Sequence, residues 1–290
     1  MKRKGIILAG GNGTRLHPLT LSTSKQLLPI YDKPMIYYPL STLMLGGIKD
    51  ILIISKPNDE NSFKKLLGDG ENFGINISYK IQPKPEGIAQ AFLLAESFLD
   101  NSPSVLILGD NLFHGDSLVS LLSEADKEFK GASIFAYAVK DPERYGVIEF
   151  NEDGIANNII EKPKNPKSSY AITGIYFYDN TVVNKVKTIK PSERGELEIT
   201  DINRIYLDEK GLKVKQLGRG ITWLDTGTFD ALYEASGYIR ALEQRQGLKI
   251  GCPEEIAWRK GWINNEKLKE IASNSIKSGY GSYLLKLIKE

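Results

Sequence analysis

A short apolar run near the N-terminus leads into a turn that is rich in glycine and ends in a cation. Residues 5–16 read GIILAGGNGTRL. Glycines in the turn leave no Cβ between the backbone and a ligand, and they permit positive φ angles. Backbone N–H groups in such a turn can converge on phosphate oxygens, and Arg15 adds a planar donor fork that suits phosphate. A second cation, Lys25, follows within SKQLLP. The pattern predicts a phosphate-binding site before residue 30.

This turn differs from the two commonest nucleotide-binding loops. The Walker pattern requires Gly-Lys-Ser or Gly-Lys-Thr after the loop, and neither follows here. The dinucleotide pattern requires a third glycine where Leu16 stands. A plain tight turn after a strand is the alternative. Arg15 and Lys25 favour phosphate binding, because a structural turn does not need two nearby cations.

Two aspartates each follow a run that is typical of a strand. Asp110 follows VLILG, and Asp225 follows ITWL. In open α/β sheets ligands bind beyond the carboxyl ends of the strands. Mg²⁺ usually takes one or two protein carboxylates and completes its shell with substrate oxygens and water, so these two aspartates could share one ion. The alternative is that each caps the following helix.

Apolar periodicity predicts a doubly wound α/β fold with a mostly parallel sheet. The first half alternates strands at 6–9, 50–55, 75–81, 105–108 and 132–139 with helices at 35–45, 58–67, 88–99 and 117–129. In the middle, strands at 146–150, 155–161 and 171–178 predict an antiparallel extension or a lid-like subregion. After it come a helix at 199–207, strands at 212–217 and 222–224, and a helix at 229–243 with Tyr233, Tyr238 and Leu242 on its apolar face. Further helices are predicted at 253–260, 266–273 and 280–288.

The bulk composition argues against several classes of protein. The chain has 290 residues and a formal net charge of +2, without the basic field that nucleic-acid binding needs. No stretch approaches the roughly 20 apolar residues of a membrane span, and the apolar run behind the basic start is too short for a secretory signal. Cys252 is the only cysteine, so an intrachain disulfide is impossible. We therefore expect a cytoplasmic protein that binds neither membranes nor nucleic acids.

Taken in order, the motifs resemble those of the sugar-1-phosphate nucleotidylyltransferases over residues 4–285. Besides LAGGNGTRL and SKQLLP, the matching segments are QPKPEGIAQA (82–91), GDN (109–111), YGV (145–147), EKP (161–163), GELEITD (195–201) and WLDTG (223–227). The resemblance implies transfer of a thymidylyl group from dTTP to glucose 1-phosphate, which gives dTDP-glucose and pyrophosphate. Uridylyl or cytidylyl transfer, a catalytically silent regulatory subunit and a P-loop hydrolase are the alternatives.

In the implied reaction the sugar phosphate attacks the α-phosphorus, so catalysis consists of positioning and charge stabilisation. The catalytic residues would be Arg15, on the β- and γ-phosphates, and Lys25, between attacking and leaving oxygens. Mg²⁺ would bind Asp110 and Asp225. The resemblance places nucleotide contacts at Leu8, Gly10, Gly11, Gly13, Thr14, Gln26, Gln82, Pro85, Gly87 and Asp110. The Gln82 amide has both donors and an acceptor for a pyrimidine edge.

Sugar-phosphate contacts are implied at Asn111, Tyr145, Gly146, Glu161, Lys162, Ile172 and Arg194. Glu161 can accept hydrogen bonds from two vicinal hydroxyls, and Lys162 can meet the sugar phosphate. Arg194 resembles a mobile arginine that reaches phosphate on closure. Without the resemblance, an exposed Glu-Lys pair before Pro163 and a surface turn at Asn111 would be ordinary alternatives.

The resemblance also implies a second, regulatory nucleotide-sugar site at a subunit interface. Its residues would be His114, Gly115, Glu255, Ile256 and Arg259, with His114 where tyrosine is common. Feedback inhibition by dTDP-rhamnose and a homotetramer follow as expectations. We expect one domain over 1–290, with a nucleotide-binding half (1–140), a sugar-phosphate part (141–227) and a helical interface part (228–290).

Overall fold

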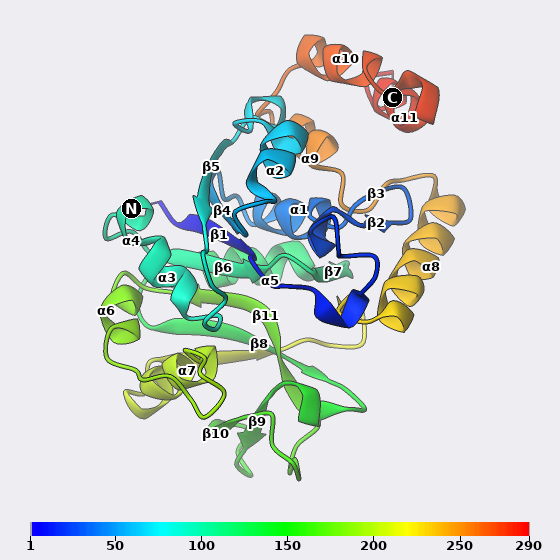
Figure 1. Cartoon of the computed structure of the whole chain (residues 1–290). Helices are drawn as coiled ribbons and strands as arrows, with labels where there is room; N and C mark the ends of the chain where they lie inside the picture. The colour runs from blue at the N-terminus through cyan, green and yellow to red at the C-terminus, as the bar shows by residue number, and fades with distance from the viewer. Residues whose placement is uncertain (1, 290) are drawn as a thin grey trace.

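A mixed sheet forms the centre of the molecule, and helices lie on both of its faces (Figure 1). The computed structural model describes residues 2–289, and within them the main sheet has nine strands. Its parallel part has the order β6-β1-β4-β5 and consists of β1 (Lys4–Ala9), β4 (Asp50–Ser55), β5 (Asn76–Ile81) and β6 (Ser104–Leu108). In this order β4 and β5 lie on one side of β1, and β6 lies on the other side. Such a switch point opens a crevice at the carboxyl ends of the two strands.

Alternate side chains of the central strands enter two separate cores. Ile7 belongs to the core that contains α1 (Tyr37–Leu45), α2 (Glu60–Leu67) and α5 (Leu118–Asp126). Ile6 belongs to the core that contains α3 (Gln90–Leu94), α4 (Glu96–Leu99), α6 (Val182–Val186) and α7 (Ile199–Asp208). Strands buried on both faces read as continuous apolar runs. The doubly wound α/β prediction is confirmed.

An antiparallel extension continues the sheet beyond β6. β11 (Tyr170–Tyr178) pairs antiparallel with β6 and with β8 (Ala132–Ala138). β9 (Gly146–Phe150) and β10 (Ala156–Glu161) form an antiparallel pair that projects from the main body (Figure 1). β12 (Leu212–Gln216) lies parallel to β8. The predicted antiparallel strands are therefore present, and they build one wall of the site described below.

A separate two-stranded ribbon was only half predicted. β13 (Ile221–Asp225) corresponds to the predicted strand at 222–224, but its partner β7 (Asn111–Gly115) was not expected. The two strands are antiparallel, with Asp225 opposite Asn111 and Thr222 opposite His114. A second unpredicted pair, β2 (Pro29–Ile30) and β3 (Lys33–Pro34), is only two residues long in each strand.

Two helix predictions need correction. The predicted helix at 88–99 is interrupted at Ala95 (φ −88°, ψ −1°), which separates α3 from α4. In α8 (Phe229–Gln246), Tyr233 is 81% exposed and does not lie on the apolar face. The buried face carries Ala235 and Ile239, and a residue two positions earlier points away from it at 3.6 residues per turn.

The C-terminal part is helical, as predicted. It consists of α9 (Pro253–Arg259), α10 (Asn265–Ser273) and α11 (Tyr280–Leu287), of which α10 and α11 form the upper end of the molecule in Figure 1. Short 3₁₀ turns lie at Thr14–Leu16, Lys25–Leu27, Glu71–Phe73, Pro142–Arg144 and Ile276–Ser278. Among residues 2–289, each helix is too short or too polar to span a lipid bilayer.

Candidate active site

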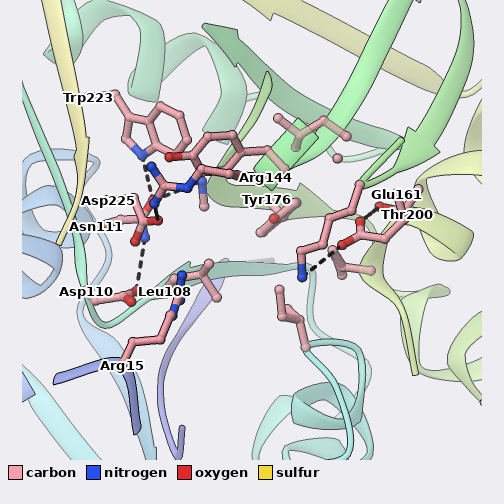
Figure 2. Close-up of a pocket in the computed structure, with 17 residues that line it drawn as sticks. Arg15, Leu108, Asp110, Asn111, Arg144, Glu161, Tyr176, Thr200, Trp223 and Asp225 are labelled. Carbon is pink, nitrogen blue, oxygen red and sulfur yellow. Dashed lines mark hydrogen bonds and ion pairs between the residues drawn. The ribbon is translucent and has the colours of Figure 1, made fainter. Parts of the chain in front are cut away.

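A cavity of about 190 Å³ lies beyond the carboxyl ends of β1 and β6. The side chains that line it come from both halves of the sheet and from the β7–β13 ribbon (Figure 2). They are Arg15, Ile88, Leu108, Asp110, Asn111, Arg144, Tyr145, Gly146, Glu161, Lys162, Ile172, Gly174, Tyr176, Ile199, Thr200, Trp223 and Asp225. The position agrees with the general rule that ligands bind at the switch point of an open α/β sheet.

The two predicted metal ligands, Asp110 and Asp225, lie together at one end of this cavity (Figure 2). Asp110 lies two residues after the end of β6 and directly before β7, and the pairing of β7 with β13 brings Asp225 back beside it. Thr226 fixes this arrangement, because its backbone N–H and its hydroxyl both donate to the Asp110 carbonyl, at 3.1 and 2.7 Å. The ribbon therefore joins two carboxylates that are far apart in the sequence.

Each carboxylate has a cationic neighbour. The Lys25 ammonium forms an ion pair with Asp110, and Arg144 Nη2 lies 3.6 Å from Asp225 Oδ2. Burial alone would raise the pKa of Asp110, but the charge of Lys25 and the hydrogen bonds from Lys25 and Asn111 lower it below its usual value. Burial, followed by the negative charge of Asp110, raises the pKa of Asp225 to about 6. The nearby cations of the protein therefore do not fully balance the negative charge of the Asp225 carboxylate.

This pair of aspartates fits a hard divalent cation. Residues 2–289 contain no group of three or more His, Cys, Asp or Glu side chains suited to a metal ion. Two carboxylates are enough for Mg²⁺ when substrate oxygens and water complete its coordination. The raised pKa of Asp225 points the same way, because a cation at this position would stabilise the ionised form.

Arg15 approaches the carboxylates from the glycine-rich turn. It lies on the 3₁₀ turn that begins at Thr14, behind Gly13, whose φ of 64° is left-handed. A Cβ at Gly227 would lie 3.1 Å from Arg15 Nη2 and 3.2 Å from Asp225 Oδ1, so the glycine allows both groups to come close. An arginine fork beside a carboxylate pair is suited to a phosphate chain that bears a divalent ion.

The predicted base-binding glutamines flank the glycine-rich turn, outside the residues that line the cavity. Gln82 is 2% exposed, and its Nε2 donates to Gln90 Oε1 at 2.6 Å. Its Oε1 faces Gly10, where a Cβ would lie only 1.8 Å away. Gln26 is also buried and accepts a hydrogen bond from the Ser24 hydroxyl at 2.6 Å.

The other predicted nucleotide contacts lie in β1, in the glycine-rich turn and in the loop after β5. Leu8 lies in β1, Gly11 and Thr14 follow it, and Pro85 and Gly87 belong to the loop after β5. Gly87 has a φ of 101°, and a Cβ there would lie 2.3 Å from the Leu197 carbonyl oxygen. This close approach packs the loop after β5 against the segment before α7.

The opposite end of the cavity carries side chains that can form hydrogen bonds with hydroxyl groups. Glu161 Oε2 accepts a hydrogen bond from the Thr200 hydroxyl at 2.5 Å, and Lys162 Nζ lies 3.6 Å from Glu161 Oε1. A Cβ at Gly146 would lie 3.1 Å from the Thr200 hydroxyl oxygen, so the glycine keeps this corner open. Ile172 lies at the same corner, with its Cδ1 3.3 Å from that Cβ position, whereas the Tyr145 ring packs edge-to-face against Trp223 with ring centres 5.2 Å apart. Figure 2 shows Glu161 and Thr200 on the far side of the cavity from Asp110 and Asp225.

Asn111 is the first residue of β7 and links the ribbon to Asp110. Its Oδ1 accepts hydrogen bonds from Trp223 Nε1 at 2.6 Å and from the Gly174 N–H at 3.2 Å, and its Nδ2 donates to Asp110 Oδ1 at 3.1 Å. It is buried, so it is not the surface turn residue of the alternative interpretation.

Arg194 is the predicted sugar-phosphate residue that lies apart from the cavity lining. Its Nη2 lies 2.5 Å from Glu196 Oε2, and its guanidinium also pairs with Glu198 at 3.2 Å. These ion pairs hold the side chain on its own loop in this conformation.

Several cavity residues were not singled out from the sequence. Arg144 and Thr200 are the chemically important ones, and Tyr176, Trp223, Ile88, Leu108, Gly174 and Ile199 complete the set. Arg144 immediately precedes the YGV motif, and Thr200 lies within GELEITD. Their adjacency to these motifs was the available signal.

A second cavity, of about 310 Å³, contains all five residues predicted for a regulatory site. His114 and Gly115 come from the end of β7, and Glu255, Ile256 and Arg259 come from α9. His114 Nδ1 lies 2.8 Å from the Tyr238 hydroxyl, and burial lowers the pKa of His114. The fold therefore brings these separate stretches of sequence to one place.

Comparison with known proteins decides the family. The family model described as nucleotidyl transferase matches residues 4–241. The chain belongs to this family. Among nucleotidyl transferases, it is 58% identical over 287 residues to a glucose-1-phosphate thymidylyltransferase of Neisseria meningitidis, covering 99% of this chain and 100% of that protein. A glucose-1-phosphate thymidylyltransferase of Mycobacterium tuberculosis is 52% identical over 286 residues, with 99% of both chains covered.

Solved structures of nucleotidyl transferases share the fold. One is assigned as a glucose-1-phosphate thymidylyltransferase from Bacillus anthracis, in complex with sucrose; its TM-score is 0.76 at 44% identity, over 82% of this chain and 95% of that one. A UDP-glucose pyrophosphorylase complexed with UDP-glucose has a TM-score of 0.73 at 26% identity, over 85% of this chain and 100% of that one. The family match ends at residue 241, so α9, α10 and α11 lie beyond it.

Proposed function

We propose that this protein transfers a thymidylyl group from dTTP to glucose 1-phosphate and releases pyrophosphate and dTDP-glucose. One observation carries the proposal: a single cavity holds Arg15, Asp110 and Asp225 at one end and the Glu161–Thr200 pair at the other. One end suits a phosphate chain and the other suits a hexose. The identity of 58% to a glucose-1-phosphate thymidylyltransferase over almost the whole chain supports the same activity.

The chain's own cations do most of the catalytic work in this proposal. Arg15 binds the β- and γ-phosphates, and its fork stabilises the charge on the departing pyrophosphate. Lys25 leaves Asp110 for the reacting phosphate, where it bridges the attacking and leaving oxygens. No covalent intermediate with the protein is required, because positioning and charge stabilisation suffice for transfer at phosphorus.

Nucleotidyl transferases generally use a divalent metal ion, and we propose Mg²⁺ for this one. Asp110 and Asp225 would hold it. When bound, Mg²⁺ neutralises phosphate charge as a Lewis acid. Asn111 keeps Asp110 in place through its Nδ2 hydrogen bond, and Thr226 holds the Asp110 backbone.

Substrate recognition is divided between the two halves of the chain. The Gln82 amide pairs with the pyrimidine edge, with Gln26 and the backbone of Gly87 beside it. The turn residues Leu8, Gly10, Gly11, Gly13, Thr14 and Pro85 complete the nucleotide site. Glu161 accepts hydrogen bonds from sugar hydroxyls, and Lys162 binds the sugar phosphate. Asn111, Tyr145, Gly146 and Ile172 enclose the sugar, and Arg194 reaches phosphate on closure.

A regulatory function is proposed for the second cavity. A nucleotide sugar such as dTDP-rhamnose would bind His114, Gly115, Glu255, Ile256 and Arg259 and inhibit the reaction, in a homotetramer. His114 is bonded to Tyr238 rather than free in the cavity, so the affinity depends on whether this pair opens. A rate and sigmoidicity unchanged by dTDP-rhamnose would remove this part of the proposal.

Pyrophosphate release tests the proposed reaction. Purified protein with Mg²⁺ is assayed with dTTP, UTP or CTP, each with and without glucose 1-phosphate. We expect release only when nucleotide and sugar phosphate are both present, with dTTP the fastest. Release without the sugar phosphate would indicate a hydrolase, faster release from UTP or CTP would change the nucleotide, and no release from folded protein would indicate a regulatory subunit.

A further inference from the structure

Arg144 reaches the candidate active site from the 3₁₀ turn before β9 (Figure 2). Its Nη1 donates to Asp141 Oδ2 at 2.6 Å, and its guanidinium carbon lies 5.3 Å from the centre of the Tyr145 ring. Its Nη2 lies 3.6 Å from Asp225 Oδ2, an ion-pair distance that is too long for a hydrogen bond. The side chain is 37% exposed. Asp141 and the Tyr145 ring therefore hold the guanidinium, and its contact with Asp225 is the longer and weaker one.

The position of Arg144 matches that of Lys25. Each cation forms an ion pair with one of the two carboxylates proposed to bind the metal: Lys25 with Asp110, and Arg144 with Asp225, on which the charges of Lys25 and Arg15 also act. A divalent cation carries the same sign as a guanidinium, so the two repel each other and compete for the same carboxylate. Arg144 must lose its contact with Asp225 when that carboxylate binds an ion.

A phosphate group is the natural new partner for the displaced guanidinium. Arg144 lines the same cavity as Arg15, which approaches Asp225 beside Gly227. The planar fork can form paired hydrogen bonds with phosphate oxygens, and the tether to Asp141 keeps it at the cavity rim. The negative charge of a substrate phosphate would thus take the place of the Asp225 carboxylate as the partner of Arg144, once the metal ion binds that carboxylate.

We propose that Arg144 is the counter-ion of Asp225 in the substrate-free protein and moves onto a substrate phosphate when a divalent cation binds. The phosphate belongs to the nucleotide or to the sugar phosphate, and the experiment below distinguishes them. This inference rests on the proposed function, since it assumes a phosphate substrate. Arg144 is then a residue that touches substrate, and it also makes metal binding by the free protein weaker.

The first measurement is the binding of Mn²⁺ alone to substrate-free protein at pH 8, followed by the electron paramagnetic resonance of free Mn²⁺. We expect Arg144→Gln to bind Mn²⁺ more tightly than the unaltered protein, on the order of 10-fold, because a competing positive charge is gone. Arg240→Gln on the exposed side of α8 makes the same charge change and should leave the affinity unaltered. A merely structural role for Arg144 would not tighten metal binding.

The second measurement is steady-state kinetics with dTTP and glucose 1-phosphate. We expect Arg144→Gln to lower kcat/KM by roughly 10²–10³, and Arg144→Lys to recover part of it, because lysine keeps the charge and loses the fork. The substrate whose KM rises is the one whose phosphate binds Arg144. Equal Mn²⁺ affinities, no Mn²⁺ binding by either protein, or undiminished kcat/KM would each overturn the inference.

The two proposals fail differently. If the unaltered protein released no pyrophosphate from these substrates, the proposed function would fall, while the Mn²⁺ comparison would still report on Arg144. If the unaltered protein were active and Arg144→Gln matched it in both measurements, only the inference about Arg144 would fall.

Discussion

Substitution of Gly10 by alanine tests the packing that holds Gln82 beside the glycine-rich turn. A Cβ at Gly10 would lie 1.8 Å from Gln82 Oε1 and 2.9 Å from its Cδ. Even a weak C–H···O contact needs about 3.3 Å, so the amide oxygen would have to move by about 1.5 Å. Gln82 has little room for this movement, because it is buried and its Nε2 is bonded to Gln90, which is bonded in turn to Glu86 at 2.7 Å.

The expected cost follows from these contacts. Overpacking costs typically 1–3 kcal/mol, and a lost hydrogen bond adds about 1 kcal/mol. We therefore expect Gly10→Ala to lower the free energy of unfolding by about 2–4 kcal/mol. Gly11→Ala is the matched control for stability, because nothing lies within 4 Å of a Cβ there. Its free energy of unfolding should stay within about 0.5 kcal/mol of the unaltered protein, or rise slightly.

Urea unfolding of the two variants measures the difference. If Gln82 also binds the pyrimidine edge, Gly10→Ala should raise the KM for dTTP by about 10-fold, which corresponds to about 1.4 kcal/mol of lost binding. The KM for glucose 1-phosphate should change little, since Glu161 lies at the other end of the cavity. Equal unfolding midpoints for the two variants would refute the reasoning, because they would mean that Gln82 swings aside without cost.

Three further predictions follow from single residues. Burial and the charge of Asp110 raise the pKa of Asp225 to about 6, so without divalent cations the free energy of unfolding should fall as the pH rises from about 4 to about 6. Asp225→Asn should abolish that fall and stabilise the metal-free protein at pH 8 by up to about 3 kcal/mol. Urea unfolding across this pH range measures both effects. Thr200→Val removes the 2.5 Å hydrogen bond to Glu161 and should raise the KM for glucose 1-phosphate about 5-fold while the KM for dTTP stays constant, in steady-state assays. Gly237→Ala lies within α8 with nothing near its Cβ, and it should stabilise the protein by about 1 kcal/mol without changing kcat; a loss of stability would contradict the open space there.

Most of the fold could be predicted because its central strands are buried on both faces. The runs at 51–54 (ILII) and 105–108 (VLIL) are apolar throughout, and both lie within strands of the structure. β7 was missed because NLFHG contains asparagine, histidine and glycine and has no apolar alternation. It is a strand because of β13, a partner far away in the sequence, and local patterns do not report such a pairing. The face of α8 was misjudged at Tyr233, because an aromatic residue says little about burial by itself.

The candidate site could be predicted in part. Asp110 and Asp225 were proposed as metal ligands because each follows a strand-like run and because the family resemblance favours a metal site over helix capping; the glycine-rich turn was proposed from its composition and the two cations that follow it. Glu161 and Lys162 depended on the family resemblance, since an exposed Glu-Lys pair is common on surfaces. The only sequence signal for Arg144 was its place directly before the YGV motif, because its 3.6 Å distance to Asp225 depends on the tertiary structure.

The β7–β13 ribbon has a consequence for how the protein is made. The glycine-rich turn and Asp110 leave the ribosome early, but Asp225 is translated much later and reaches Asp110 only when β13 pairs with β7. Pairings between distant segments form late, since a long loop must close before they are stabilised. A nascent or truncated chain can therefore form the glycine-rich turn, yet it cannot assemble both carboxylates. Turnover becomes possible only when most of the chain has been synthesised and folded.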